Sequence, residues 1–222
     1  MLDCIELAST PNPDACVIWL HGLGADGYDF VPIVKEIEAL GAPAARYVFP
    51  HAPKRAVTIN GGSVMRAWYD ILGVDLVRRE DETGIRESHV HVEALIAREI
   101  GRGLARNRIV LAGFSQGGAI TLHTGLRQNA PLAGLLALST YLPLASVFDA
   151  ERKPGSAGVP IFLAHGQSDP VIPLARGAAS RDLLVRSGYE VQWHEYPMQH
   201  SVCAEEVHDI AAFLRTVLPK PV

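Results

Sequence analysis

The feature that most restricts the fold is a serine flanked by glycines where two hydrophobic patterns meet. The sequence GFSQGG (113–118) follows the short aliphatic run 109–112, and a run with helical spacing (116–126) begins at once after the serine. A strand that turns tightly into a helix exposes such a serine at the helix N-terminus, where backbone N–H groups favour negative charge. The pattern therefore predicts a nucleophile at Ser115, with an ordinary helix N-cap as the alternative.

Two kinds of hydrophobic run alternate along the whole 222-residue chain. Short β-branched or aliphatic runs predict strands, and apolar residues at three- and four-residue steps predict helices. Several short runs lack in/out alternation, which is typical of strands covered on both faces of a parallel sheet. The predicted strands are 16–20, 47–49, 109–112, 135–138, 160–164 and 191–196, and the predicted helices are 30–40, 89–100, 116–126, 173–186 and 204–218.

This alternation predicts one α/β domain over residues 1–222, with a mostly parallel central sheet and helices on both faces. No internal repeat or long linker divides the chain. The segment 55–82 fits the alternation least well. We therefore predict that it is a short insertion over one end of the sheet.

Composition excludes several classes of partner. The chain is 48% hydrophobic and 20% charged, its formal net charge is −4, and no Lys/Arg cluster forms a stripe, so we expect no nucleic-acid partner. Three cysteines without metal-ligand spacing indicate free thiols in a reducing compartment and no metal. The N-terminal residues do not read as a signal peptide. We therefore expect a cytoplasmic protein.

One uncharged stretch, 128–148, is long enough to span a bilayer. Pro131 and Pro143 interrupt it, and polar residues lie in its middle. A buried strand followed by a loop explains it better. We therefore expect no stable insertion into a membrane.

A serine needs a histidine base, held by a carboxylate, to become a good nucleophile. Asp169 follows the predicted strand 160–164 and His200 follows the predicted strand 191–196, so both fall at the carboxyl edge of the sheet. Their order after the serine matches the order in α/β-hydrolases. We predict a triad of Ser115, Asp169 and His200. The other downstream histidines fit lining or structural roles better: His123, His165, His194 and His208.

Acyl transfer also requires N–H donors for the oxyanion of the tetrahedral intermediate. One is the backbone amide of Gln116, the residue after the nucleophile. The glycines of HGLGADG (21–27) permit an inward-pointing amide at Leu23. The same segment matches the dinucleotide-binding pattern G-x-G-x-x-G, but the region about twenty positions on, RYVFPHAP (46–53), lacks the acidic residue that this class requires.

Several blocks in order resemble the phospholipase/carboxylesterase family of α/β-hydrolases, which includes acyl-protein thioesterases and small bacterial carboxylesterases. These blocks are VIWLHGLGADGYDF, FPHAP, INGG, RAWYDI, LAGFSQGGAI, LAHGQSDPVIP and the His200 loop. The INGG and RAWYDI blocks suggest no chemistry by themselves. The resemblance implies a compact hydrolase without a large cap domain or a cofactor. It also implies an acyl-serine intermediate and the roles already given to Ser115, Asp169, His200, Leu23 and Gln116.

The resemblance further implies an apolar acyl groove beside the serine. Its candidate walls, each of which fits core packing equally well, are Trp68, Ile71, Leu72, Val171 and Met198. We expect a carboxylesterase for small-molecule esters of short to medium acyl chains. The alternatives are an acyl-protein thioesterase or lysophospholipase acting on long chains, and a catalytically silent binding module on the same fold. Bacterial relatives are often homodimers, which the sequence neither supports nor opposes.

Overall fold

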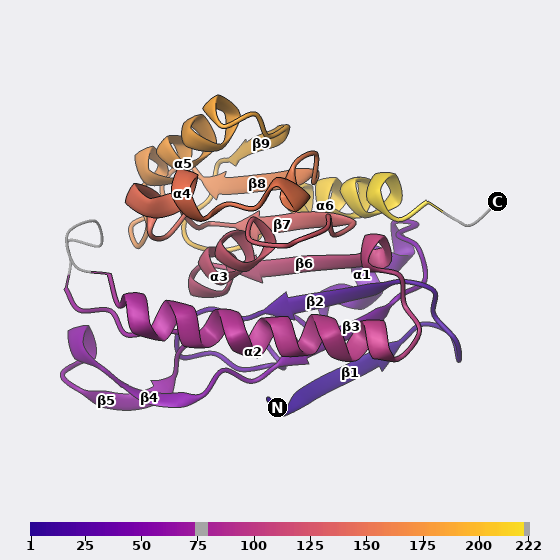
Figure 1. Cartoon of the computed structure of the whole chain (residues 1–222), viewed down its shortest axis with the longest axis horizontal. Helices are drawn as coiled ribbons and strands as arrows, with labels where there is room; N and C mark the ends of the chain where they lie inside the picture. The colour runs from indigo at the N-terminus through magenta and orange to yellow at the C-terminus, as the bar shows by residue number, and fades with distance from the viewer. Residues whose placement is uncertain (74–79, 220–222) are drawn as a thin grey trace.

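Seven strands form one sheet, in the order β1-β3-β2-β6-β7-β8-β9, and helices cover both of its faces (Figure 1). The structure is a computed structural model and describes residues 1–73 and 80–219. Only β1 pairs antiparallel to its neighbour, and every other pair in this sheet is parallel. The strands are β1 (Cys4–Ala8), β2 (Cys16–Leu20), β3 (Arg46–Pro50), β6 (Ile109–Phe114), β7 (Gly134–Leu138), β8 (Ile161–Gly166) and β9 (Val191–Tyr196). The predicted mostly parallel α/β fold is confirmed.

The central strands are buried on both faces, which explains their continuous hydrophobic runs. In β2, Ile18 and Leu20 belong to one core cluster, whereas Val17 and Trp19 belong to the cluster on the opposite face. The first cluster lies under α2 (Glu82–Gly101), α3 (Gln116–Gly125), α4 (Phe148–Glu151) and α5 (Leu174–Arg186), and the second lies under α1 (Ile33–Ala39) and α6 (Ala204–Val217). The chain also makes short 3₁₀ turns: η1 (Thr58–Asn60), η2 (Arg106–Arg108), η3 (Ala145–Val147) and η4 (Pro154–Ser156).

Helix α2 begins at Glu82, seven residues before the start predicted from hydrophobic spacing. The Asp81 side chain accepts a hydrogen bond from the amide of Gly84 at 2.9 Å and so caps the first turn. The first two turns are rich in polar residues, ETGIRESH, and this weakens the apolar repeat. The sequence pattern therefore missed them.

The segment predicted as an insertion contains a two-stranded hairpin, β4 (Lys54–Val57) and β5 (Ser63–Arg66). Its turn explains the INGG block, because Gly61 and Gly62 have φ angles of 65° and 79°. Glycine adopts this left-handed conformation without a steric penalty. Ile59, in the turn of the hairpin, donates its backbone N–H to Ile71 O at 2.9 Å. This bond ties the hairpin turn to the chain that follows β5.

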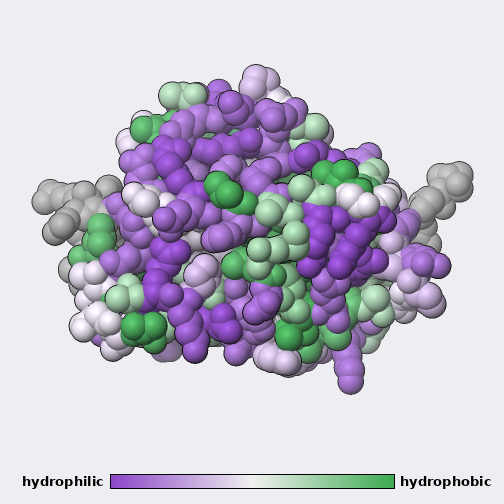
Figure 2. Space-filling view, turned by 60° about the horizontal axis from the view of Figure 1, so that its bottom comes forward, coloured by the Kyte–Doolittle hydropathy of each residue, from purple (hydrophilic) through white to green (hydrophobic). Residues whose placement is uncertain are grey.

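The surface is chemically mixed. Hydrophilic side chains cover most of the face in Figure 2, with separate hydrophobic patches between them. Large apolar side chains that are more than a third exposed include Tyr28, Ile59, Val64 and Val171. Within residues 1–73 and 80–219, no helix has the length and apolar character needed to cross a membrane.

Candidate active site

Ser115 lies in the turn between β6 and α3 with a φ of 54°, which is uncommon for a residue other than glycine. A side chain at Gly113 or Gly117 would collide with backbone atoms, so both glycines are required for this tight turn. Ser115 N donates to Leu138 O at 2.8 Å, and Thr140 Oγ1 donates to Ser115 O at 2.7 Å. These two bonds hold the serine in its strained conformation.

The structure brings Ser115, His200 and Asp169 into one hydrogen-bonded chain. His200 Nε2 lies 2.9 Å from Ser115 Oγ, and His200 Nδ1 lies 2.7 Å from Asp169 Oδ2. The Nδ1–H group donates to the carboxylate, so the lone pair of Nε2 is available to accept the serine proton. The second oxygen, Asp169 Oδ1, accepts from the amides of Val171 and Ile172 at 2.8 and 2.9 Å. The three side chains follow β6, β8 and β9, all at the carboxyl edge of the sheet.

His165 supports the loop that carries Asp169. Its Nε2–H donates to Ile172 O at 2.8 Å and lies 3.5 Å from Asp169 Oδ2. The ring is fully buried, and Gly177 packs against its other nitrogen. His165 therefore stabilises the 166–172 loop and does not contact Ser115.

The glycine-rich segment that follows β2 lies beside the serine. A side-chain carbon at Gly22 would be 3.5 Å from Ser115 Cβ. In the described part of the chain, the amide N–H groups of Leu23 and Gln116 have no hydrogen-bond partner. Both amides are therefore available to a ligand in the way that an oxyanion hole requires.

Two imidazoles for which the sequence pattern predicts no role hold this segment in place. His21 Nδ1–H donates to Gly22 O at 2.7 Å, and His21 Nε2 accepts from Ala52 N at 3.1 Å. Burial lowers the pKa of His21 to about 4, which keeps the ring neutral and lets Nε2 act as an acceptor. His51 Nδ1 accepts from Gly27 N at 3.0 Å. The HGLG and FPHAP blocks contain both histidines, but only the fold shows that they brace one loop.

The carbonyl of Gly22 and the N–H of Leu23 belong to the same peptide unit. Because that unit is planar and trans, its C=O and N–H groups point in opposite directions. The bond from His21 to Gly22 O therefore also fixes the direction of the Leu23 N–H.

The five candidate groove residues do not share one environment. Val171 is 57% exposed next to Asp169, and Ile71, Leu72 and Met198 are half-buried. The prediction for Trp68 is wrong in this structure, because this residue is completely buried in the core. Its indole Nε1–H donates to His21 O at 2.9 Å, so the ring is bonded to the start of the glycine-rich segment inside the core instead of lining a groove.

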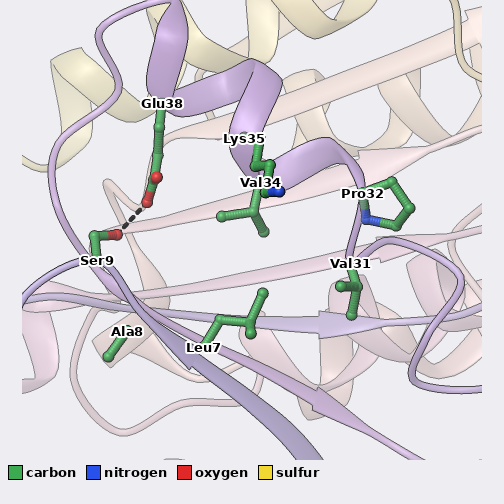
Figure 3. A pocket seen from close by; sticks show the side chains of 8 residues that line it. All are labelled: Leu7, Ala8, Ser9, Val31, Pro32, Val34, Lys35 and Glu38. Carbon is green, nitrogen blue, oxygen red and sulfur yellow. Dashed lines mark hydrogen bonds between the residues drawn. The ribbon is translucent and has the colours of Figure 1, made fainter.

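A hollow of about 460 Å³ between β1 and α1 is not part of this constellation. Leu7, Val31 and Val34 form its apolar floor, and Ser9 and Glu38 are hydrogen-bonded at its rim (Figure 3). Residue Ala8 pairs with Arg46, the first residue of β3, so the hollow lies towards the amino ends of the parallel strands. It contains none of the candidate site residues.

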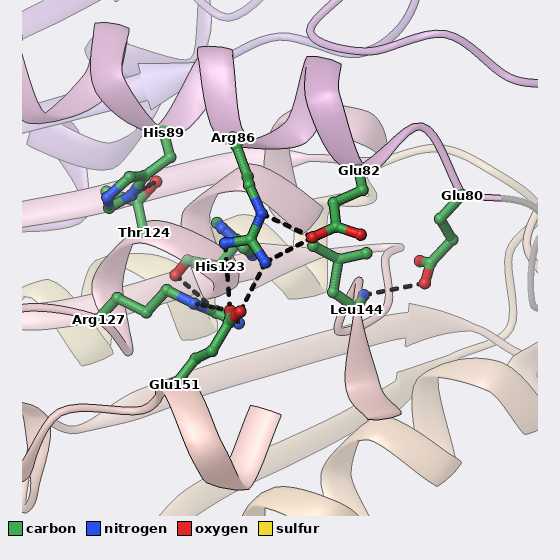
Figure 4. A network of polar contacts seen from close by, with 9 residues as sticks. All are labelled: Glu80, Glu82, Arg86, His89, His123, Thr124, Arg127, Leu144 and Glu151. Atoms are coloured by element: carbon green, nitrogen blue, oxygen red, sulfur yellow. Dashed lines mark hydrogen bonds and ion pairs between the residues drawn. The ribbon is translucent and has the colours of Figure 1, made fainter. Parts of the chain in front are cut away.

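The histidines of α2 and α3 are also separate from the hydrogen-bonded chain of Ser115, His200 and Asp169. His123 is buried and its ring packs edge-on against His89, with 5.6 Å between the ring centres (Figure 4). Burial lowers the pKa of His123 to about 3. Beside them, Glu151 bonds Arg86 and Arg127 and so joins α4 to α2 and to the chain just after α3. Among the described residues, no three His, Cys, Asp or Glu side chains are grouped so that they could hold a metal ion.

The chain is similar to known proteins over nearly its full length. A family model described as Phospholipase/Carboxylesterase matches residues 4–218. The chain is similar to acyl-protein thioesterase 1 of Neurospora crassa, with 43% identity over 216 residues, or 93% of this chain and 88% of that protein. It is 40% identical over 232 residues to acyl-protein thioesterase 1 of Mycosarcoma maydis, which covers 97% of this chain and 96% of that protein.

Solved structures give the same result. Acyl-protein thioesterase 2 of Zea mays has a TM-score of 0.85 at 25% identity, covering 98% of this chain and 100% of that one. SOBER1 of Arabidopsis thaliana has a TM-score of 0.85 at 29% identity, covering 92% and 99%. Esterase PE8 has a TM-score of 0.84 at 27% identity, covering 98% and 99%.

Proposed function

The chain belongs to the phospholipase/carboxylesterase family of hydrolases, and from this membership and the geometry around Ser115 we propose that it is a serine hydrolase that removes acyl groups from thioesters. The observation that carries the proposal is the hydrogen-bonded chain from Ser115 through His200 to Asp169. A binding module would have no need for a serine in a strained turn that faces an imidazole lone pair.

In the proposed reaction, Ser115 Oγ attacks the acyl carbon and its proton passes to His200 Nε2. The carbonyl electrons move onto the oxygen, where the amides of Leu23 and Gln116 stabilise the negative charge. The intermediate collapses, the bond to the leaving group breaks, and the proton on His200 passes to the departing thiolate or alkoxide. Asp169 orients the imidazole and stabilises its protonated form throughout.

Water completes the cycle on the acyl-serine. His200 removes a proton from the water as its oxygen attacks the acyl carbon, and the same two amides stabilise the second oxyanion. The bond to Ser115 Oγ then breaks, and the serine recovers its proton from His200. The products are the free carboxylic acid and the original enzyme, so the residues named here are sufficient for the proposed chemistry.

The family relatives favour the thioesterase over the short-chain carboxylesterase expected from the sequence. Two relatives at 40% identity or more carry the name acyl-protein thioesterase 1. We therefore propose S-acylated protein cysteines as the substrate class. A carboxylesterase is the second candidate, supported by the likeness to esterase PE8. The proposed walls of the acyl groove are Ile71 and Leu72 in the 55–82 segment, and Val171 and Met198 in the loops that carry Asp169 and His200. A cytoplasmic location remains a prediction.

The test compares kcat/KM for matched thioesters and oxygen esters whose acyl chains run from acetyl to palmitoyl, with Ser115→Ala as the blank. A thioesterase for lipid-modified cysteines predicts rates that rise with chain length and favour the thioester. A maximum at short or medium oxygen esters would support the carboxylesterase instead. If no substrate shows turnover that depends on Ser115, the hydrolase proposal fails.

A further inference from the structure

Residues 66–69, which we name the bridging segment, contact both parts of the chain that carry the proposed oxyanion-hole amides. On one side, Arg66 O accepts from Gly24 N at 2.9 Å, and Trp68 Nε1 donates to His21 O at 2.9 Å. On the other side, Trp68 N donates to the Gln116 side chain at 2.8 Å. The segment therefore adds a second connection between the glycine-rich loop and the serine turn, besides the pairing of β2 with β6 and the packing of Gly117 against Leu20 and His21.

The Gln116 side chain makes the second of these connections with both of its polar atoms. Its Oε1 accepts from Trp68 N, and its Nε2 donates to Tyr69 O at 2.7 Å. The side chain is 2% exposed, so water does not compete for these bonds. An amide that is bonded at both ends has one orientation, and this orientation also restrains the Cα of Gln116.

The same residue carries one of the two proposed oxyanion donors on its backbone. The other donor, Leu23 N–H, lies between Gly22, whose carbonyl His21 holds, and Gly24, whose amide Arg66 holds. Both donors are therefore anchored to the bridging segment. Gln116 bonds the segment through its own side chain. Leu23 is held through its neighbour Gly24, which bonds Arg66, and through His21, which bonds both Gly22 and Trp68. An oxyanion hole works only if both donors lie near hydrogen-bond distance of one point.

We propose that the bridging segment sets the separation of the two oxyanion-hole amides, and that the Gln116 side chain and the Trp68 indole are positioning residues for the reaction. This inference rests on the proposed function. It assigns the RAWYDI block a role in transition-state stabilisation, where Trp68 acts through its hydrogen bonds and not through contact with the acyl chain.

Substitution of the Gln116 side chain tests the proposal cleanly, because the backbone N–H stays in place. Gln116→Met keeps the length of the side chain and removes both hydrogen bonds. Gln116→Glu keeps the acceptor for Trp68 N and removes the donor to Tyr69 O. Trp68→Phe keeps a buried aromatic ring and removes the bond to His21 O. Thr58→Val is the matched control, since it removes the 2.5 Å bond from Thr58 Oγ1 to Asp70 elsewhere in the insertion.

The measurements are kcat and KM on one ester of the series, divided by the number of sites that a fluorophosphonate labels at completion. We expect kcat to fall about 10- to 100-fold in Gln116→Met and Trp68→Phe, with KM within about threefold, because the lost interaction acts in the transition state. Gln116→Glu should also lose kcat, and Thr58→Val should match the wild type. A general structural defect would instead reduce the number of labelled sites or raise KM.

The proposal is wrong if Gln116→Met and Trp68→Phe keep the kcat of the Thr58→Val control per labelled site. If Gln116→Met does not fold, the more conservative Trp68→Phe decides the question. Failure of the proposed function has a different signature, because the wild-type protein itself would then show no turnover that depends on Ser115.

Discussion

His21 donates a hydrogen bond from Nδ1 to the carbonyl oxygen of Gly22 at 2.7 Å, and this bond determines which way the next amide points. The ring is fully buried and neutral because burial lowers its pKa to about 4. A residue that touches no substrate thereby orients one of the two proposed oxyanion donors.

The first prediction concerns this bond. In His21→Ala the peptide unit between Gly22 and Leu23 can rotate, so kcat should fall about 100-fold, as for loss of one oxyanion donor. His21→Asn places an amide N–H where Nδ1 lies and should recover a part of this loss. Steady-state kinetics on a single ester measure both. Equal activity of His21→Ala and the wild type would contradict the assignment.

The second prediction uses Glu206, on the first turn of α6. Its side chain is fully buried, and burial raises its pKa from 4.5 to about 8, although the backbone N–H of Cys203 acts in the opposite direction. Between these two values the unfolded chain holds fewer protons than the folded one, so stability falls as the pH rises. The slope approaches about 1.4 kcal/mol per pH unit.

Glu206→Gln removes this titration. Urea unfolding at pH 5, 7 and 9 should therefore show the variant gaining stability relative to the wild type as the pH rises. Parallel pH profiles for the two proteins would show that Glu206 is not protonated in the folded state.

The third prediction concerns the ion pairs in Figure 4, where Glu151 lies 2.7 Å from Arg127 and 2.6 Å from Arg86. Hydrogen bonding to Arg86, and then to Arg127, lowers the pKa of Glu151 to about 2. The Arg127 side chain is only 7% exposed. Glu151→Gln should thus cost about 2 kcal/mol of unfolding free energy at pH 7, because it leaves a mostly buried cation without its partner.

This stabilisation is complete above pH 4.5, the ordinary value for the glutamate, and is lost as the pH falls towards 2. The difference between wild type and Glu151→Gln should shrink accordingly when urea unfolding is repeated at pH 3. The kcat per labelled site should not change, since Glu151 lies outside the proposed triad and the bridging segment. A difference that is the same at pH 3 and pH 7 would mean that the charge of Glu151 does not stabilise the fold.

Much of the fold could be predicted because the central strands are covered on both faces. A run such as CVIWL in β2 is hydrophobic at every position, which few other elements permit. Strand β1 was missed because it is a five-residue edge strand whose Glu6 pairs with Arg98 on α2 and with Arg102, the residue after this helix. Such ion pairs form only after the chain has folded, so no local sequence pattern predicts them.

In the candidate site, too, residues in a local sequence pattern could be predicted, whereas residues that depend on distant contacts could not. Ser115 could be singled out because a strand, a glycine-bounded turn and a helix follow each other directly in sequence. Trp68 could not be assigned, because an aromatic residue in a sequence fits a groove and a core equally well. The roles of His21 and His51 depend on contacts with Ala52 and Gly27, which are 31 and 24 residues away along the chain.

In the proposed reaction, Ser115, activated by His200, forms an acyl-enzyme. The most direct test of this step is the mass of the intact protein after brief exposure to a long-chain acyl thioester and rapid acid quenching, with peptide mapping of the modified residue. We expect one acyl group per chain on Ser115, no such adduct in Ser115→Ala, and at most about a thousandth of the wild-type rate of adduct formation in His200→Ala. Turnover of the thioester by Ser115→Ala at the wild-type rate would contradict it.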